Sequence, residues 1–161
     1  MADQNEQADM PQGNPGYITD MDLRIFLRDK DPELNLLLDD FEFTPEELRT
    51  ATTLAVDKWN ETPPVLGTHI FTAFTFPFRY NLILGASANL MYMAAMRYRR
   101  NSLKYNIPGG QVADQEKYQE YDAAGQRLSQ EYTDWMAKMK RAINIECGWG
   151  IVDGGMHRYP R

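Results

Sequence analysis

The sequence contains few of the residues that catalytic and metal sites use most. It has one cysteine, Cys147, and two histidines, His69 and His157. A lone cysteine cannot form an internal disulfide, which points to a reducing compartment. Neither histidine has another ligand residue at the close spacing of a zinc site, so we expect no bound metal and no cofactor. We interpret His69 as a hydrogen-bonded strand residue and His157 as part of a tail.

Long apolar runs are also missing. The most apolar stretch, Leu82–Met96, contains Ser87 and Asn89, and it is shorter than the about 20 residues that a membrane-spanning helix needs. Residues 1–15 are polar and acidic, without the apolar region of a signal peptide. We therefore expect neither a membrane span nor a signal peptide.

Positive charge is in short supply as well. The chain carries 17 Lys and Arg against 23 Asp and Glu, a formal net charge of −6. An acidic chain repels polyphosphate, which excludes broad, non-specific binding to nucleic acid. Its 43% hydrophobic and 25% charged composition is that of an ordinary globular protein, and 161 residues suffice for one domain with a modest core.

What the sequence does contain is a series of clear helix signals. Thr19 with Asp22, and the segment Thr44-Pro45-Glu46-Glu47, are N-cap patterns that each open a helix with an apolar stripe. Pro63-Pro64 ends the second of these helices, because proline cannot continue a helix. A third, central helix runs from about Tyr80 to Lys104. Its small residues permit close packing, Met93 and Met96 are among its bulky residues, and Pro108-Gly109-Gly110 breaks the chain after it.

The longest predicted helix runs from about Asp114 to Ile143. Apolar and aromatic residues recur along it with steps of three and four, as in a heptad seam, while Lys138 and Lys140 belong to its charged faces. Such a helix spans about 45 Å, more than a small domain needs for its own core. The predicted seam residues are Tyr118, Tyr121, Gly125, Leu128, Tyr132, Trp135, Met139 and Ala142.

Together these signals predict a mainly α-helical bundle with two long helices. Residues 17–147 form the single domain, residues 1–16 a flexible N-terminal arm, and residues 148–161 an extended C-terminal docking tail. The tail is too rich in glycine to be helical but carries apolar side chains. Its predicted partner-contact residues are Trp149, Ile151, Val152, Met156 and Tyr159.

Residues 65–79 have a different pattern from the helices. Phenylalanines alternate with Thr75 and Pro77, which favours an extended excursion or a β-ribbon. Phenylalanines exposed on such a segment call for a neighbouring subunit to cover them. The predicted interface residues are Phe71, Phe74, Phe76 and Phe78.

A basic patch ends the third helix. Arg97, Arg100 and Lys104 share one face, with Arg99 beside them. Three interpretations stay open: contact with phosphate or passing DNA, cations that stabilise a helix C-terminus by pairing with nearby acids, and a salt-bridge surface between subunits.

Carboxylates cluster at two places. Asp39 and Asp40 are interpreted as the solvent-exposed end of a helical turn, although paired carboxylates can also serve as acid and base. Glu46 and Glu47 are explained by the helix start, where acids favour the positive end of the dipole. We therefore expect no catalytic residues.

The order of these elements resembles the head–tail connector (adaptor) proteins of tailed bacteriophages. The resemblance is one of layout over residues 17–161. It implies a twelve-fold ring below the portal, with residues 148–161 docked into the portal and residues 65–78 facing other subunits or the tail. The segments that carry it are Tyr17-Ile18-Thr19-Asp20, Thr44 through Trp59, Leu82 to Arg100 and Tyr118 to Ile143.

The sequence thus predicts a non-enzymatic virion structural protein, a connector or neck ring subunit that links the portal to the tail. It would be assembled in the host cytoplasm, with the portal and other neck or tail proteins as partners. Two alternatives remain beside it: a tail or baseplate structural protein, and a cellular helical adaptor that dimerises through the seam. A small enzyme that uses Asp39, Asp40 or His69 is the least favoured hypothesis.

Overall fold

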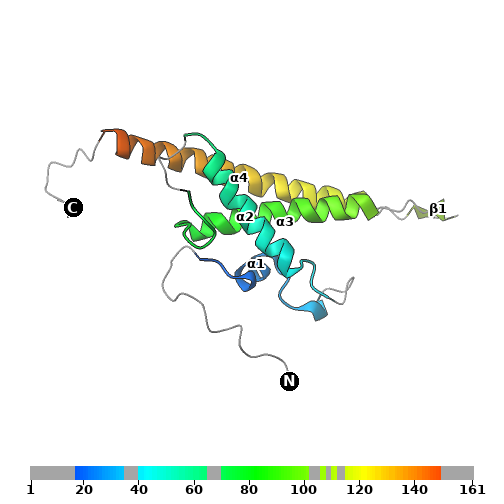
Figure 1. The fold of residues 1–161 in the computed structure, drawn as a ribbon. Coiled ribbons are helices and arrows are strands. Elements are labelled where there is room, and N and C mark those ends of the chain that lie inside the picture. The colour runs from blue at the N-terminus through cyan, green and yellow to red at the C-terminus, as the bar shows by residue number, and fades with distance from the viewer. Residues whose placement is uncertain are drawn as a thin grey trace, which may run out of the picture.

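The computed structural model describes residues 17–34, 40–64, 70–101, 106–107, 110–111 and 115–149. Within these ranges the chain forms four α-helices, a short 3₁₀ helix (η1, Pro32–Leu34) and a small hairpin. Figure 1 shows α3 (Arg79–Asn101) and α4 (Gln115–Trp149) running side by side in opposite directions, with α2 (Pro45–Glu61) crossing them. The predicted mainly α-helical bundle with two long helices is confirmed.

Helix α1 (Asp20–Leu27) begins at Thr19, as its capping pattern predicts. The Thr19 hydroxyl accepts a hydrogen bond from the Asp22 N–H at 3.2 Å, and the Asp22 carboxylate accepts one from the Thr19 N–H at 2.8 Å. The helix ends at Arg28, whose φ of 62° is left-handed. This short helix packs against α3 and α2.

A buried ion pair then holds the segment that leads into α2. The Arg24 guanidinium lies 2.7 Å from the Asp29 carboxylate, and it also donates to the Phe43 carbonyl at 2.8 Å. The same carboxylate accepts the N–H of Glu42 at 2.7 Å and that of Phe43 at 3.3 Å. Because these groups are buried, their mutual pairing is what makes burial of the charges tolerable.

Helix α2 also has the predicted ends. Thr44 and Glu47 form a reciprocal capping box with hydrogen bonds of 3.2 and 2.9 Å, and the helix stops at Thr62, before the two prolines. Its buried stripe consists of Leu48, Ala51, Thr52, Ala55, Val56 and Trp59.

Helices α3 and α4 form the largest contact of the molecule. A Cβ placed on Gly85 would lie 3.0 Å from both the Ala55 Cβ and a Tyr132 ring atom, so glycine lets three helices meet at this point. The segment that connects α3 to α4 contains two short strands, β1 (Asn106–Ile107) and β2 (Gly110–Gln111), which pair antiparallel. This turn lies where the Pro-Gly-Gly break is predicted.

Long polar side chains join α2 to α4. The Tyr132 hydroxyl donates to the Ala55 carbonyl at 2.8 Å, and the Lys58 ammonium donates to the hydroxyls of Ser129 and Thr133 at 3.1 and 3.0 Å. The Lys140 ammonium donates to the carbonyls of Trp59 and Thr62 at the end of α2. Lys140 is 1% exposed, which corrects its assignment to the charged outer face.

The long helix α4 extends beyond its predicted end at Ile143. It has 35 residues against 23 in α3, and in Figure 1 its C-terminal end projects past the rest of the bundle. Gly148 and Trp149 are helical, so the tail predicted from residue 148 is wrong at its boundary. Residues 1–16 and 150–161, which include the rest of both predicted arms, lie outside the described residues.

The prediction of an extended excursion or β-ribbon at residues 65–79 is not confirmed. Residues 65–69 lie outside the described residues, and residues 70–78 contain no strand. Instead, the N–H groups of Thr75 and Phe76 donate to the Thr72 carbonyl at 3.1 and 3.0 Å, which closes a turn. Because a turn breaks the two-residue alternation of a strand, Phe74, Phe76 and Phe78 no longer share one face.

Candidate functional site

A large apolar depression lies between α2 and the second half of α3. It has a volume of about 910 Å³ and exposes far more apolar than polar surface. We call it the arginine-rimmed groove. It is lined by Glu47, Leu54, Asn89, Tyr92, Met93, Met96, Arg97, Arg99 and Arg100.

The helical repeat explains why these residues meet. Asn89, Met93, Met96 and Arg100 recur at steps of three and four, so they share one face of α3. Glu47 and Leu54 are seven residues apart and share a flank of α2. Met96 is 66% exposed and Leu54 is 45% exposed, so the floor of the groove is apolar surface open to solvent.

The basic patch does not act as one unit, because Arg97 is held within the protomer. Its guanidinium donates to the Glu42 carbonyl at 2.8 Å and lies 3.3 Å from the Glu47 carboxylate and 3.5 Å from that of Glu42. Arg99 and Arg100 are exposed at the rim, whereas Lys104 lies outside the described residues. For Arg97, pairing with acids inside the protomer is therefore the correct interpretation, but the acids come from the approach to α2 and its first turn.

Glu42 connects the groove to a second, smaller pocket. The Tyr98 hydroxyl donates to the Glu42 carboxylate at 3.3 Å, and the Tyr98 ring stacks on Tyr121 with centroids 5.2 Å apart. Burial and the Glu42 charge raise the pKa of Tyr98, and the same two causes raise that of Tyr121. The pocket has a volume of about 450 Å³.

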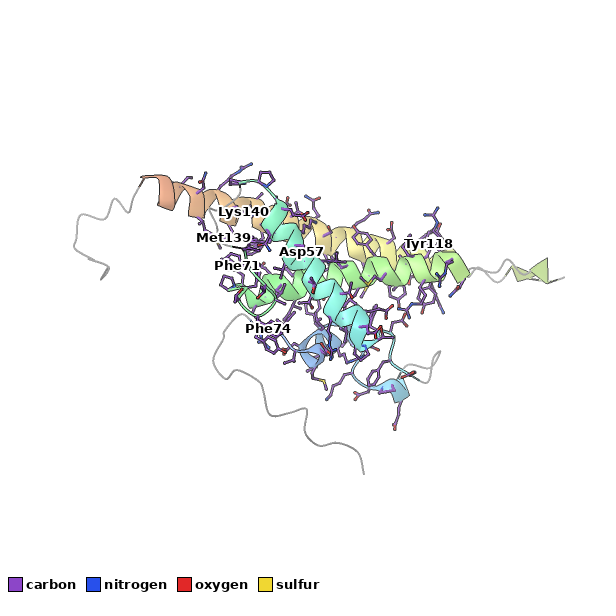
Figure 2. The ribbon with its side chains drawn as sticks, viewed as in Figure 1. Asp57, Phe71, Phe74, Tyr118, Met139 and Lys140 are labelled. Carbon is purple, nitrogen blue, oxygen red and sulfur yellow. The ribbon has the colours of Figure 1, made fainter. Side chains whose placement is uncertain are left out.

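A second exposed apolar area lies around α1, and we call it the α1 face. Met21 is 50% exposed, Ile25 52% and Phe74 57%. The Tyr17 ring stacks on Phe74 at 5.4 Å with an interplanar angle of 8°. Figure 2 shows Phe74 close to α1 and away from α4. Phe74 is thus the one predicted interface phenylalanine that the turn presents to solvent.

The other phenylalanines predicted as interface residues pack inside the protomer. Phe76 is fully buried, and its ring meets that of Trp59 at 5.4 Å. Phe78 lies 5.1 Å from Trp135, and Phe71 lies 6.5 Å from Trp59. The turn at Thr72–Thr75 directs these rings into one aromatic cluster. This corrects the assignment of Phe76 to a neighbouring subunit, whereas Phe71 and Phe78 are half-buried and their contact with a neighbour stays a prediction.

The predicted seam of α4 is used within the protomer. Gly125 and Tyr132 are buried, and Tyr121, Trp135 and Met139 are half-buried. The pattern drifts toward the C-terminal end, where Met136 and Lys140 are buried but Ala142 is exposed. Figure 2 shows Met139 near Phe71, and Lys140 beside the end of α2.

The projecting end of α4 carries one further exposed apolar side chain. Ile145, which is 59% exposed, lies on the last turns of the helix, beyond the last buried residue. The side chain of Trp149 lies outside what the structure describes, as do Ile151, Val152, Met156 and Tyr159.

Among the candidate catalytic residues, the structure describes Asp40, Glu46 and Glu47. Asp40 is exposed and accepts a hydrogen bond from the Phe41 N–H at 2.7 Å, and Glu47 is occupied by the α2 cap. Asp39, His69, His157 and the Cys147 side chain lie outside the described residues. In the described part of the chain, no cluster of His, Cys, Asp or Glu could hold a metal ion, and no helix is long and apolar enough to cross a membrane.

The sequence interpretation missed the groove floor. It assigned Met93 and Met96 to the bulk of a central helix, because a 3.6-residue repeat does not say which face a partner covers. The four-residue step from Met96 to Arg100 was the available signal, because it places an apolar and a charged residue on the same face of the helix. No family model, curated protein or solved structure matches the chain.

Proposed function

We propose that the chain is a structural subunit that works as a homo-oligomeric ring, in a virion as a head–tail connector or neck protein linking the portal to the tail. One observation carries the assembly part: a protomer that packs its aromatic cluster within itself keeps two exposed apolar areas on different parts of its surface. These are the arginine-rimmed groove and the α1 face, and Ile145 is exposed at the end of α4 as well.

Separate, dissimilar patches favour head-to-tail contacts. When one patch of a subunit binds a different patch of the next, the contact repeats, and it closes into a ring if the rotation allows. A two-fold dimer would need one self-complementary patch. The α4 seam, which had favoured a dimerising adaptor, is already covered by α2 and α3.

The composition of the groove supports a protein partner. Interfaces are enriched in Met, Tyr and Arg, and these three residue types line the α3 side of the groove. Methionine side chains adapt their shape to a partner, which suits a surface that binds during assembly. The position at the neck, the portal as partner and the twelve-fold order come from the resemblance in layout.

Native mass spectrometry of the full chain over a range of concentrations tests the assembly. We expect a closed ring of identical subunits, visible as rings in negative-stain electron microscopy. A chain that stays monomeric at every concentration would overturn the proposal. A dimer as the only assembly would favour the cellular adaptor.

Immunogold labelling of tailed particles that contain the chain tests its position. Label at the junction of head and tail is expected. Label at the tail or baseplate would instead assign the chain to the alternative class of virion structural protein.

A further inference from the structure

The arginine-rimmed groove has a charge opposite to that of the chain. The chain has a net charge of −6, yet the groove presents Arg97, Arg99 and Arg100 against a single acid, Glu47. Glu47 is taken up by Arg97 and by the α2 cap. A partner with an acidic, partly apolar segment would therefore find both an oppositely charged rim and an apolar floor.

The chain itself contains such a segment. Residues 1–16 carry Asp3, Glu6 and Asp9 and no Lys or Arg, and they include Met1 and Met10. We propose that the arginine-rimmed groove binds residues 1–16 of a neighbouring copy, with Met10 on the Met93–Met96 floor and the carboxylates against the arginine rim. The inference rests on the proposed function only in requiring a neighbouring copy.

The place where the segment leaves the bundle favours a neighbour over the same protomer. Residue 16 precedes Tyr17, which lines a pocket with Arg49, Thr52 and Thr53 on one flank of α2. The groove uses Glu47 and Leu54 on the other flank, and two residues of α-helix turn through about 200°. A segment docked in its own groove would have to cross the solvent side of α2.

The length of the segment is sufficient for this contact. Sixteen residues span at most about 53 Å when extended, which is longer than α3, at about 35 Å for its 23 residues. The groove volume of about 910 Å³ is in the range of sites that enclose a ligand of several residues.

Nucleic acid is the competing occupant, because arginines also bind phosphate. The floor argues against it: Met93, Met96 and Leu54 offer no hydrogen bonds to a sugar or phosphate. A protein segment with apolar side chains between its carboxylates uses the floor as well as the rim.

Site-specific photocrosslinking in the full chain tests the inference. Gln7 is replaced by p-benzoyl-phenylalanine, and isotopically light and heavy chains are mixed before irradiation. We expect crosslinks between light and heavy chains that map to Met93 or Met96 by mass spectrometry. The matched control carries the same photoreactive group at Gln126, which is exposed on α4, and should give no crosslink to the groove.

Charge reversal adds a second readout. Arg99→Glu with Arg100→Glu should lower the crosslink yield about tenfold, while the circular dichroism spectrum stays unchanged because both side chains are exposed. Asp3→Lys, Glu6→Lys and Asp9→Lys in the partner chain should restore the yield. The inference would be overturned if neither set of substitutions changed the crosslink yield, or if crosslinks formed only within one chain.

Anisotropy with a labelled single-stranded DNA completes the test. We expect no saturable binding that depends on Arg99 and Arg100. Binding that the two substitutions abolish, together with no crosslink between chains, would assign the groove to nucleic acid. Rings that form without these crosslinks would contradict this inference but not the proposed function. Crosslinks between light and heavy chains in dimers, with no rings, would support this inference and contradict the proposed function.

Discussion

The two halves of α3 differ in how much of their surface the protein covers. From Leu82 to Leu90, nearly every residue is buried, because α1, α2 and α4 surround the helix. From Tyr92 onward, Ala94 and Ala95 remain buried, whereas Met96 is 66% exposed. One helix thus serves as the core of the protomer in its first half and as a docking surface in its second. Stability and assembly should therefore respond to substitutions in different halves.

The largest contrast is expected from truncating one apolar residue in each half. Leu90→Ala should lower the free energy of unfolding by about 2–5 kcal/mol, since Leu90 is fully buried and the change leaves a cavity. Met96→Ala should change it by less than about 0.5 kcal/mol. Urea unfolding followed by circular dichroism measures both. If both substitutions lowered the free energy of unfolding by similar amounts, the groove would already be covered in the free protein. The proposed difference between the two halves of α3 would then be wrong.

The second contrast uses two glycines that face neighbouring helices. A Cβ on Gly85 would lie 3.0 Å from the Ala55 Cβ, which belongs to a packed helix and cannot retreat. A Cβ on Gly125 would lie 3.2 Å from the half-buried Tyr92 ring, which can move aside, and 3.3 Å from the Met91 Cβ. Gly85→Ala should therefore cost about 1–3 kcal/mol. Gly125→Ala should be close to neutral, because alanine favours the helix by about 0.5–1 kcal/mol.

The third contrast is a dependence on alkaline pH. The Tyr132 hydroxyl is buried, and burial raises its pKa above the usual value of 10.0. The folded chain therefore keeps this proton at a pH where the unfolded chain releases it. The resulting stability is present below pH 10 and is lost as the pH rises further, by at most about 1.4 kcal/mol per pH unit.

Tyr132→Phe should remove this component from the slope of unfolding free energy against pH. Burial lowers the pKa of Lys58 and of Lys140 below 10.5, which contributes a slope of opposite sign up to that pH in both proteins, so the difference between them isolates Tyr132. Tyr80→Phe, at a side chain 61% exposed, is the control. Identical slopes for the wild type and Tyr132→Phe would show that the phenol is not protected.

The smallest effect is expected from separating the arginines. Arg97→Gln should cost about 1 kcal/mol, because it leaves the largely buried Glu42 carboxylate without its cation. Arg100→Gln should stay within about 0.5 kcal/mol and should alter the salt dependence of assembly instead. If Arg100→Gln destabilised the monomer as much as Arg97→Gln, the patch would be structural throughout.

Local signals made the starts of α1 and α2 predictable. Thr19 and Thr44 act through residues three positions away, so the sequence alone shows the capping partners. The course of α4 was predictable for the same reason, because a repeat of apolar residues over many turns needs no knowledge of other elements.

Features that depend on distant segments were not predictable. Lys140 looks like a surface residue until α2 ends beside it and offers its last carbonyls. Arg97 meets Glu42 and Glu47, which lie 55 and 50 residues away. The phenylalanines of residues 71–78 alternate as in a strand, and only the hydrogen bonds of the Thr72–Thr75 turn show that three of them face inward.

The greater length of α4 has a mechanical consequence. Its 35 residues exceed the 23 of α3 by about 18 Å of helix, and Ala142, Asn144 and Ile145 near this end are exposed. Such an overhang works as a lever: a rotation of about 10° at the core displaces its tip by about 3 Å over that length. Lys58, Tyr132 and Lys140 join α2 to α4. A small rotation of α4 at these contacts would therefore displace the end of the helix that carries Ile145.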